Sequence, residues 1–290
     1  MKFSYFPGCS LKGMGGAYET SLIAVMEALS VQLEELDDWN CCGATAYMSV
    51  DESKAFTLAA RNLAIAEKKT DDLLAPCAAC FLVLQKTQKY IKDYPEVGRV
   101  VRESLRAGGY DYAGSTRIRH PLDVIVNDIG LDTIKKTVKH PLKGLKIAPY
   151  YGCQVVRPYA TFDHQDYPVT MDNLLKALGA DVVHYPLKTK CCGGSLTGTL
   201  PEVGARLSNI LIREAKRQGA DLITTLCPLC FFNLDSYQDK MEGPEKITMP
   251  ITYFTQLMGL AFGMPSSKLG LKRHIIPILP ILKERQVAIA

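Results

Sequence analysis

The spacing of apolar residues along this chain changes from helical to strand-like and back, which marks out a regular series of elements. Within residues 51–68 the apolar side chains recur at three-to-four spacing, as on one face of a helix. Residues 31–36 instead alternate between apolar and polar side chains, as in a strand. For the first half of the chain the pattern predicts strands at 2–6, 31–36 and 73–75 and helices at 17–29 and 51–68.

The second half repeats this order of elements. The same patterns predict strands at 146–150, 181–185 and 221–225 and helices at 171–178 and 201–218. Between the halves, the pattern of residues 98–137 predicts additional helices with a break near Gly108 and Gly109. Within this stretch, residues 120–125 resemble residues 249–254 of the second half in position and in apolar pattern. We expect the residues from 263 onward to form a tail that docks on the rest of the chain.

Alternation of strands and helices is typical of parallel sheets, because each crossover helix returns the chain to the same edge. We therefore predict an α/β fold with two pseudo-symmetric halves, each a mostly parallel sheet flanked by helices. Ligands of such sheets bind beyond the carboxyl ends of the strands. Residues that can bind a metal or a ligand are therefore expected to form a site where they directly follow a strand.

The ten cysteines are such residues, and they form two copies of one pattern. Each copy has a lone cysteine, then an adjacent pair followed by glycine, then a C-x-x-C motif. The gap between the pair and the C-x-x-C motif is 34 residues in both halves, and the gap before the pair is 31 and 37 residues. This repetition indicates two metal sites made by duplication, with five thiols each. The two sets are Cys9, Cys41, Cys42, Cys77 and Cys80, and Cys153, Cys191, Cys192, Cys227 and Cys230.

Composition limits the alternatives. With 47% hydrophobic and 22% charged residues and no apolar run long enough for a membrane helix, the chain is typical of a soluble globular protein. Its amino terminus runs directly into the first cysteine motif and does not resemble a signal peptide, so we expect a cytoplasmic location. Thiols stay reduced there, which favours metal chemistry over disulfides. A net charge of +4 suits a small anionic substrate and is too weak to indicate nucleic acid.

Zinc and iron–sulfur clusters both bind thiolates. Zinc takes four tetrahedral ligands, and an adjacent cysteine pair with a fifth thiol left over fits that geometry poorly. All-thiolate sites otherwise point to iron–sulfur clusters. Five thiols for each site favour a cluster of unusual shape, which the spacing alone does not define.

The motif Cys-x31-Cys-Cys-Gly-x33-Cys-x-x-Cys and its second copy resemble the cysteine-rich CCG domain, duplicated as in HdrB, a subunit of the heterodisulfide reductase of methanogenic archaea. The resemblance covers residues 1–265. It implies CCG domains at 1–144 and 145–265, with a docked tail at 266–290. It also implies two noncubane 4Fe-4S clusters, with the first five cysteines holding one and the last five the other.

The resemblance further implies the catalytic subunit of an oxidoreductase of methanogenesis, which reduces the CoM-S-S-CoB disulfide to coenzyme M and coenzyme B thiols. Two electrons are needed, so we expect the substrate disulfide to lie between the two clusters. Such a substrate carries sulfonate, phosphate and carboxylate groups, which Arg and Lys recognise. Besides the cluster ligands we expect no catalytic residue, and the candidates for contact with substrate are Lys12, Arg157, Lys188 and Lys190, with His164 as a proton donor.

The chain has no dinucleotide-binding motif, no P-loop and no ferredoxin run of cysteines, so electrons must come from a partner. The resemblance implies two partner subunits of heterodisulfide reductase, one ferredoxin-like and one flavin-containing, linked to a hydrogenase or formate dehydrogenase for electron bifurcation. Two alternatives remain open. One is an electron-transfer component of a succinate, fumarate, glycolate or lactate oxidoreductase, and the other is a structural zinc-binding scaffold.

Overall fold

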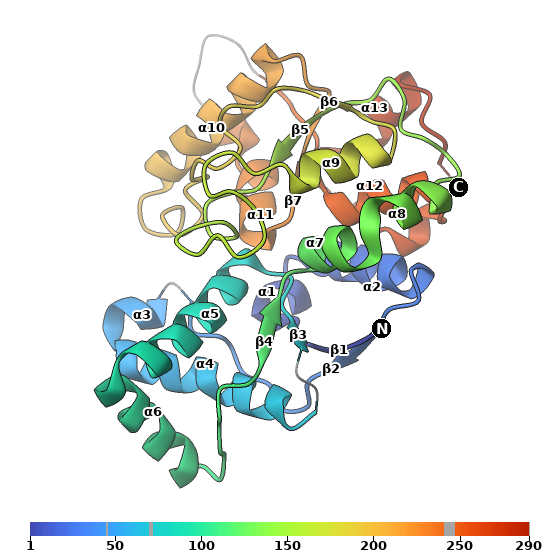
Figure 1. The fold of residues 1–290 in the computed structure, drawn as a ribbon. Helices are drawn as coiled ribbons and strands as arrows, with labels where there is room; N and C mark the ends of the chain where they lie inside the picture. The colour runs from blue at the N-terminus through green and yellow to red at the C-terminus, as the bar shows by residue number, and fades with distance from the viewer. Residues whose placement is uncertain (45, 70–71, 241–246, 290) are drawn as a thin grey trace.

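A computed structural model describes residues 1–44, 46–69, 72–240 and 247–289, and within them the chain forms two four-stranded parallel sheets, one in each half (Figure 1). The first sheet has the strand order β2-β1-β3-β4, and the second has the corresponding order β6-β5-β7-β8. The predicted α/β fold with two pseudo-symmetric parallel sheets is thereby confirmed. The strands are β1 (Lys2–Tyr5), β2 (Gln32–Glu35), β3 (Asp72–Leu74), β4 (Arg117–Arg119), β5 (Lys146–Tyr150), β6 (Asp181–Val182), β7 (Leu222–Thr225) and β8 (Ile251–Tyr253).

Helices surround both sheets. In the first half they are α1 (Gly8–Lys12), α2 (Gly16–Ala28), α3 (Ala46–Val50), α4 (Glu52–Glu67), α5 (Ala78–Asp93), α6 (Pro95–Ala107), α7 (Pro121–Asp123), a π-helical turn (Val124–Gly130) and α8 (Leu131–Thr137). In the second half they are α9 (Thr170–Ala177), α10 (Pro201–Arg217), α11 (Pro228–Ser236), α12 (Phe254–Ala261) and α13 (Leu279–Glu284), with 3-10 turns at Gln238–Lys240, Ser266–Lys268 and Leu271–Arg273. No helix among the described residues is both long and apolar enough to cross a membrane.

Local sequence explains where the main helices begin. Asp51 caps α4 by accepting a hydrogen bond from the Lys54 N–H at 3.0 Å. Pro201 occupies the first turn of α10, where its missing N–H costs no hydrogen bond. The central strand β7 is buried along its whole length, because helices cover both faces of its sheet.

The two halves pack against each other through helices. Helix α2 of the first half contacts α12 of the second, and the hydroxyls of Ser21 and Thr255 form a buried hydrogen bond of 2.7 Å between them. The tail joins this contact, because Gly270 approaches Ala17 so closely that a Cβ at Gly270 would lie 2.9 Å from the Ala17 Cα. In the tail, Leu271 is buried as well.

Three sequence expectations about elements were wrong in detail. Residues 98–137 contain strand β4, which escaped detection because its three residues, Arg117 to Arg119, offer one apolar side chain and no alternation. Strand β6 has two residues where five were expected. The segments 120–125 and 249–254 are not equivalent in register, since β8 lies inside the second whereas β4 ends just before the first.

The tail carries a buried histidine, His274, that should make the stability of the protein depend on pH. The side-chain amide of Gln256 donates a hydrogen bond to His274 Nε2 at 2.9 Å, and burial lowers the pKa of His274 to about 4. Because the unfolded chain has the higher histidine pKa, about 6.5, it binds more protons between that pH and about 4. The free energy of unfolding should therefore fall as the pH drops through this window, by about 3 kcal/mol at most.

Chemical denaturation at several pH values measures this loss. His274→Gln keeps an acceptor for Gln256 and removes the titrating group, so the variant should lose less stability than the wild type over the same pH window. Equal losses in the two proteins would contradict the assignment.

Candidate metal centre

The cysteine motifs of each half follow three strands of one sheet, so the fold brings them to the same edge. In the first half Cys9 follows β1, Cys41 and Cys42 follow β2, and Cys77 follows β3. The second half repeats this placement after β5, β6 and β7. Each C-x-x-C motif starts at the residue before a helix, so its second cysteine lies in the first helical turn of α5 or α11.

Within the first half the thiols form a continuous series of contacts. The Sγ atoms of Cys9 and Cys41 are 3.8 Å apart, and those of Cys42 and Cys80 are 3.2 Å apart. Cys41 is adjacent to Cys42, and Cys77 lies close enough to Cys80 to raise the pKa of the Cys80 thiol, which completes the series. The five side chains therefore lie side by side at the sheet edge, as the spacing of the motifs predicts.

The second half shows the same kind of contacts. Cys192 Sγ lies 3.5 Å from Cys230 Sγ. Cys191 lies close enough to Cys153 to raise the pKa of the Cys153 thiol, and Cys227 acts in the same way on Cys230. All ten cysteines are free thiols. The same cysteines of the motif are therefore neighbours in both halves, although the number of residues between the lone cysteine and the adjacent cysteine pair differs.

The two series meet at Cys77 and Cys227. These residues begin the C-x-x-C motifs of different halves, and their thiols are close enough to affect each other, which lowers the pKa of Cys77 and raises the pKa of Cys227. Both are almost fully buried. We call this contact the thiol junction. It connects the two five-cysteine sets at their buried ends.

The opposite ends of the two series reach the surface. Cys9, Cys41 and Cys191 are exposed and Cys153 is half-buried, whereas the remaining six thiols are buried. Each half therefore has a closed side at the thiol junction and an open side at its lone cysteine.

Glycines line both sets at corresponding positions. Gly8 and Gly152 both have positive φ, and a Cβ added to them would lie 2.9 Å from Cys80 Sγ and 3.0 Å from Cys230 Sγ. The backbone therefore approaches a buried thiol in each half as closely as only glycine allows.

A second pair of glycines hydrogen-bonds to the thiols. The N–H of Gly43 donates to Cys41 Sγ at 3.5 Å, and that of Gly193 donates to Cys191 Sγ at 3.3 Å. Such N–H donors stabilise a negatively charged sulfur. In the second half the hydrogen bond from Cys153, that from Gly193 and the nearby charge of Arg157 lower the pKa of Cys191 to about 6, against the effect of burial.

Two of the predicted substrate-contact residues, Lys12 and Lys188, are engaged in short ion pairs. Lys12 Nζ lies 2.8 Å from Glu19 and 2.7 Å from Glu35, and Lys188 Nζ lies 2.9 Å from Asp172. These pairs neutralise much of the positive charge that the sequence places beside the cysteines.

The other three candidates lie in the second half. Arg157 donates to the Thr189 carbonyl, its guanidinium lies 3.8 Å from the Asp166 carboxylate, and its charge acts on Cys191. Lys190 is exposed and forms no ion pair with any residue that the structure describes. His164 is also exposed, and its Nδ1 accepts hydrogen bonds from the backbone N–H groups of Asp166 and Tyr167.

Sequence reasoning missed an exchange of aromatic rings between the halves. Tyr18 of the first half stacks on Tyr253 of the second, and Phe162 of the second half stacks on His120 of the first. Tyr18 and Phe162 each follow the lone cysteine of their half by nine residues. Aligning the halves on those cysteines would have revealed this equivalence.

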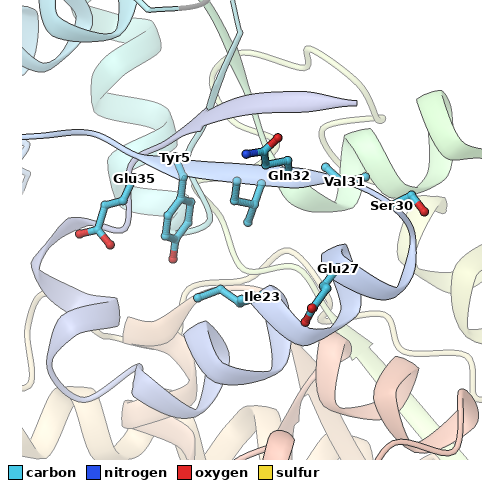
Figure 2. Close-up of a pocket in the computed structure, with 8 residues that line it drawn as sticks. Tyr5, Ile23, Glu27, Ser30, Val31, Gln32 and Glu35 are labelled. Atoms are coloured by element: carbon cyan, nitrogen blue, oxygen red, sulfur yellow. The ribbon is translucent and has the colours of Figure 1, made fainter.

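No three His, Cys, Asp or Glu side chains of the described part of the chain are arranged around one point as ligands of a single ion. A hollow of about 550 Å³ lies beside β2, but it is lined by residues such as Tyr5, Ile23 and Leu33 and by the carboxylates of Glu27 and Glu35 (Figure 2). Its acidic lining is unsuited to an anionic substrate.

Comparisons with known proteins agree with the duplicated pattern. The CCG family, described as a cysteine-rich domain, matches residues 3–85 and 147–235. The 8-methylmenaquinol:fumarate reductase membrane anchor subunit of Wolinella succinogenes is 31% identical over 283 residues, which are 95% of this chain and 97% of that protein. A protein of Archaeoglobus profundus named as like HdrB of heterodisulfide reductase is 31% identical over 279 residues, 93% of either chain.

Two further similarities extend this picture. HdrB of a CoB-CoM heterodisulfide reductase from Methanosarcina acetivorans is 29% identical over 293 residues, 97% of this chain and 96% of that protein. The crystal structure of a hypothetical protein from Helicobacter pylori has the same fold, with a TM-score of 0.76 at 14% identity over 96% of this chain. This chain spans 52% of that longer structure. The chain therefore belongs to the CCG cysteine-rich domain family, among relatives that include HdrB of heterodisulfide reductases.

Proposed function

We propose that this chain is the catalytic subunit of a heterodisulfide reductase, which reduces the CoM-S-S-CoB disulfide to coenzyme M and coenzyme B in methanogenesis. Relatives over nearly the whole chain are named after that enzyme. The observation that carries the proposal is the thiol junction, because it joins two five-cysteine sets in one buried contact. Two adjacent one-electron sites suit a reaction that needs two electrons.

The donor set fits iron–sulfur clusters. Thiolate is the protein ligand of such clusters, and each half supplies five thiols beside glycines that leave room near the buried sulfurs. The thiols of each set lie in a series at one edge of a sheet, from an exposed end to a buried end. We assign one noncubane 4Fe-4S cluster to each five-cysteine set. When bound, each cluster would supply one of the two electrons.

The protein itself would bind and orient the anionic substrate and exclude water from its disulfide. Arg157 is the best-placed cation, because it lies near Cys191 at the open end of the second set. Lys190 would add a second positive charge. Lys12 and Lys188 would act mainly through their ion pairs, which hold the surrounding loops.

His164 is proposed as the proton donor. To donate a proton the ring would have to be an imidazolium, in which both nitrogens carry hydrogen, so Nδ1 would give up the backbone hydrogen bonds that it accepts from Asp166 and Tyr167. An imidazolium is a general acid suited to protonating the product thiolates.

Arg157→Gln should raise the KM for CoM-S-S-CoB about tenfold, because a charge-assisted hydrogen bond of about 1.5–3 kcal/mol is lost. Steady-state kinetics with the reduced protein measures this change, and kcat should change far less. Arg217→Gln removes an exposed guanidinium that is paired with Glu214 on α10, and it serves as the control. An unchanged KM in Arg157→Gln would exclude this arginine from substrate binding.

The reaction itself is tested by mixing the anaerobically purified protein, reduced with a viologen dye, with CoM-S-S-CoB. Dye oxidation and release of two thiols for each disulfide would support the proposal. No turnover by a protein that contains its full iron would contradict it.

Partners and location follow from the same proposal. We propose that electrons arrive from a ferredoxin-like subunit and a flavin-containing subunit, linked to a hydrogenase or formate dehydrogenase that supports electron bifurcation. The assembly would form in the cytoplasm, where the ten thiols stay reduced. The domains would be 1–144 and 145–265, followed by the docked tail 266–290. Residues 241–246 of the second domain and Ala290 of the tail lie outside the described residues.

A second candidate function has its own support. The chain is 31% identical, over 95% of its length, to a protein named as the membrane anchor subunit of 8-methylmenaquinol:fumarate reductase. In such an enzyme the thiol junction would connect two clusters that pass electrons on without binding a disulfide. Co-purification of the chain with a fumarate-reducing flavoprotein, together with no activity toward CoM-S-S-CoB, would favour this candidate.

A further inference from the structure

Two tyrosine hydroxyls are buried beside the thiol junction without a hydrogen-bond partner. Tyr18 comes from α2 of the first half, and Tyr253 lies at the end of β8 in the second half. Both side chains are fully buried, and neither hydroxyl has a partner among the described residues. A buried polar group without a partner is costly, which points to an acceptor that occupies the site in the functional protein.

The position of the two rings indicates which acceptor this is. They stack with centroids 4.6 Å apart and an angle of 7° between planes. Tyr253 pairs with Thr225 of β7, two residues before Cys227, and Gly15, which precedes the helix of Tyr18, lies against Pro228, the residue after Cys227. Phe231, which follows Cys230, also stacks on Tyr253, with ring centroids 4.3 Å apart. The tyrosine pair is therefore held in place by aromatic packing at the boundary of the two halves, next to the thiols that join the two sets.

A comparable aromatic contact across the halves has no unpartnered hydroxyl. Phe162, which follows Cys153 by nine residues as Tyr18 follows Cys9, lies half-buried in a loop and stacks on His120 with an angle of 10° between planes. Both ring nitrogens of His120 are engaged, one with the Pro76 carbonyl and one with the Leu122 N–H. Of these two aromatic contacts, the one between Tyr18 and Tyr253 carries the unpartnered hydroxyls.

We propose that Tyr18 and Tyr253 form a hydrogen-bond donor pair for the sulfur atoms of the iron–sulfur clusters that Cys77 and Cys227 would ligate. This inference rests on the proposed clusters and adds a role that the cysteines alone do not supply. Hydrogen bonds to ligand sulfur favour the more negative, reduced state of a cluster and raise its reduction potential. One tyrosine pair beside both thiolates would raise the potentials of the two clusters together.

Tyr18→Phe and Tyr253→Phe test the proposal, because each substitution removes the hydroxyl and keeps the stacked ring. Iron content is measured first, and the potentials then follow from redox titration of the metal-loaded protein monitored by electron paramagnetic resonance. Each variant should keep wild-type iron and shift the reduction equilibrium about tenfold toward the oxidised state, which is about 59 mV for one electron. An exchangeable-proton coupling of the wild-type clusters should weaken in both variants.

Tyr185→Phe is the matched control, because Tyr185 is also buried but its hydroxyl donates to the Leu211 carbonyl at 2.9 Å. Its potentials should equal those of the wild type. If the wild type holds iron and the Tyr18 and Tyr253 variants keep its potentials, the donor pair is refuted and the proposed function stands. If the wild type holds no iron–sulfur cluster, both are refuted.

Discussion

Substituting Cys42 with alanine should remove about half of the iron and lower disulfide reduction by more than about 100-fold. Cys42 is a buried member of the first thiol series, with its Sγ 3.2 Å from Cys80 Sγ, so its loss interrupts that set alone. The second set is complete within residues 145–265 and should keep its cluster. Activity should nevertheless collapse, because the remaining site supplies one electron where the disulfide needs two.

Iron analysis and the viologen-coupled assay on the same preparation measure both effects. Cys192→Ala is the mirror-image variant, since Cys192 contacts Cys230 at 3.5 Å, and it should give the same result from the other half. Ser10→Ala changes a non-ligating neighbour, 4.0 Å from Cys77 Sγ, and should keep full iron. Full activity with half the iron would contradict the two-site account.

Adding one methyl group at Gly152 should cost the second half its cluster. The new Cβ would lie 3.0 Å from Cys230 Sγ, and the positive φ of 68° adds backbone strain of about 1–2 kcal/mol. The thiol is the atom that must move, because the backbone of β5 and its loop are fixed by the sheet. Iron content should therefore fall by about half in Gly152→Ala, since a displaced ligand weakens metal binding by about 10–100-fold or more.

Gly144→Ala separates the effect of backbone strain from the effect of the close contact with the thiol. Gly144 has a φ of +78°, and no other described atom would lie within 4 Å of its Cβ. This variant should carry the backbone strain and lose stability, yet keep full iron. The free energy of unfolding from denaturant titration and the iron content of both variants make the comparison, and equal iron in the two would show that Gly152 has no special role at the thiols.

The features that repeat at fixed spacing could be predicted from the sequence. The two cysteine sets and the parallel sheets followed from periodicity and from motifs placed after strands, and relatives and structure confirm the family and the fold. Strand β4 was missed because three residues with a single apolar side chain, Ile118, carry no periodic signal. Tertiary pairing with β3 makes this segment a strand, and a local pattern does not contain that information.

The environment of the site depended on long-range contacts that no local pattern encodes. Lys12 looked like a free cation beside Cys9, but the fold places Glu35, from the neighbouring strand, 2.7 Å from its Nζ. The thiol junction likewise requires Cys77 and Cys227, 150 positions apart, to meet where the halves pack. Repetition in a sequence predicts two equivalent sites, whereas their contact is decided by packing between helices such as α2 and α12.

We propose that each half holds one four-iron cluster. The first measurement to make is the iron, acid-labile sulfide and zinc content of protein purified without oxygen. We expect about eight iron and about eight sulfide for each chain, with little zinc. About two zinc ions with little iron would contradict it and would identify the chain as a zinc-stabilised scaffold.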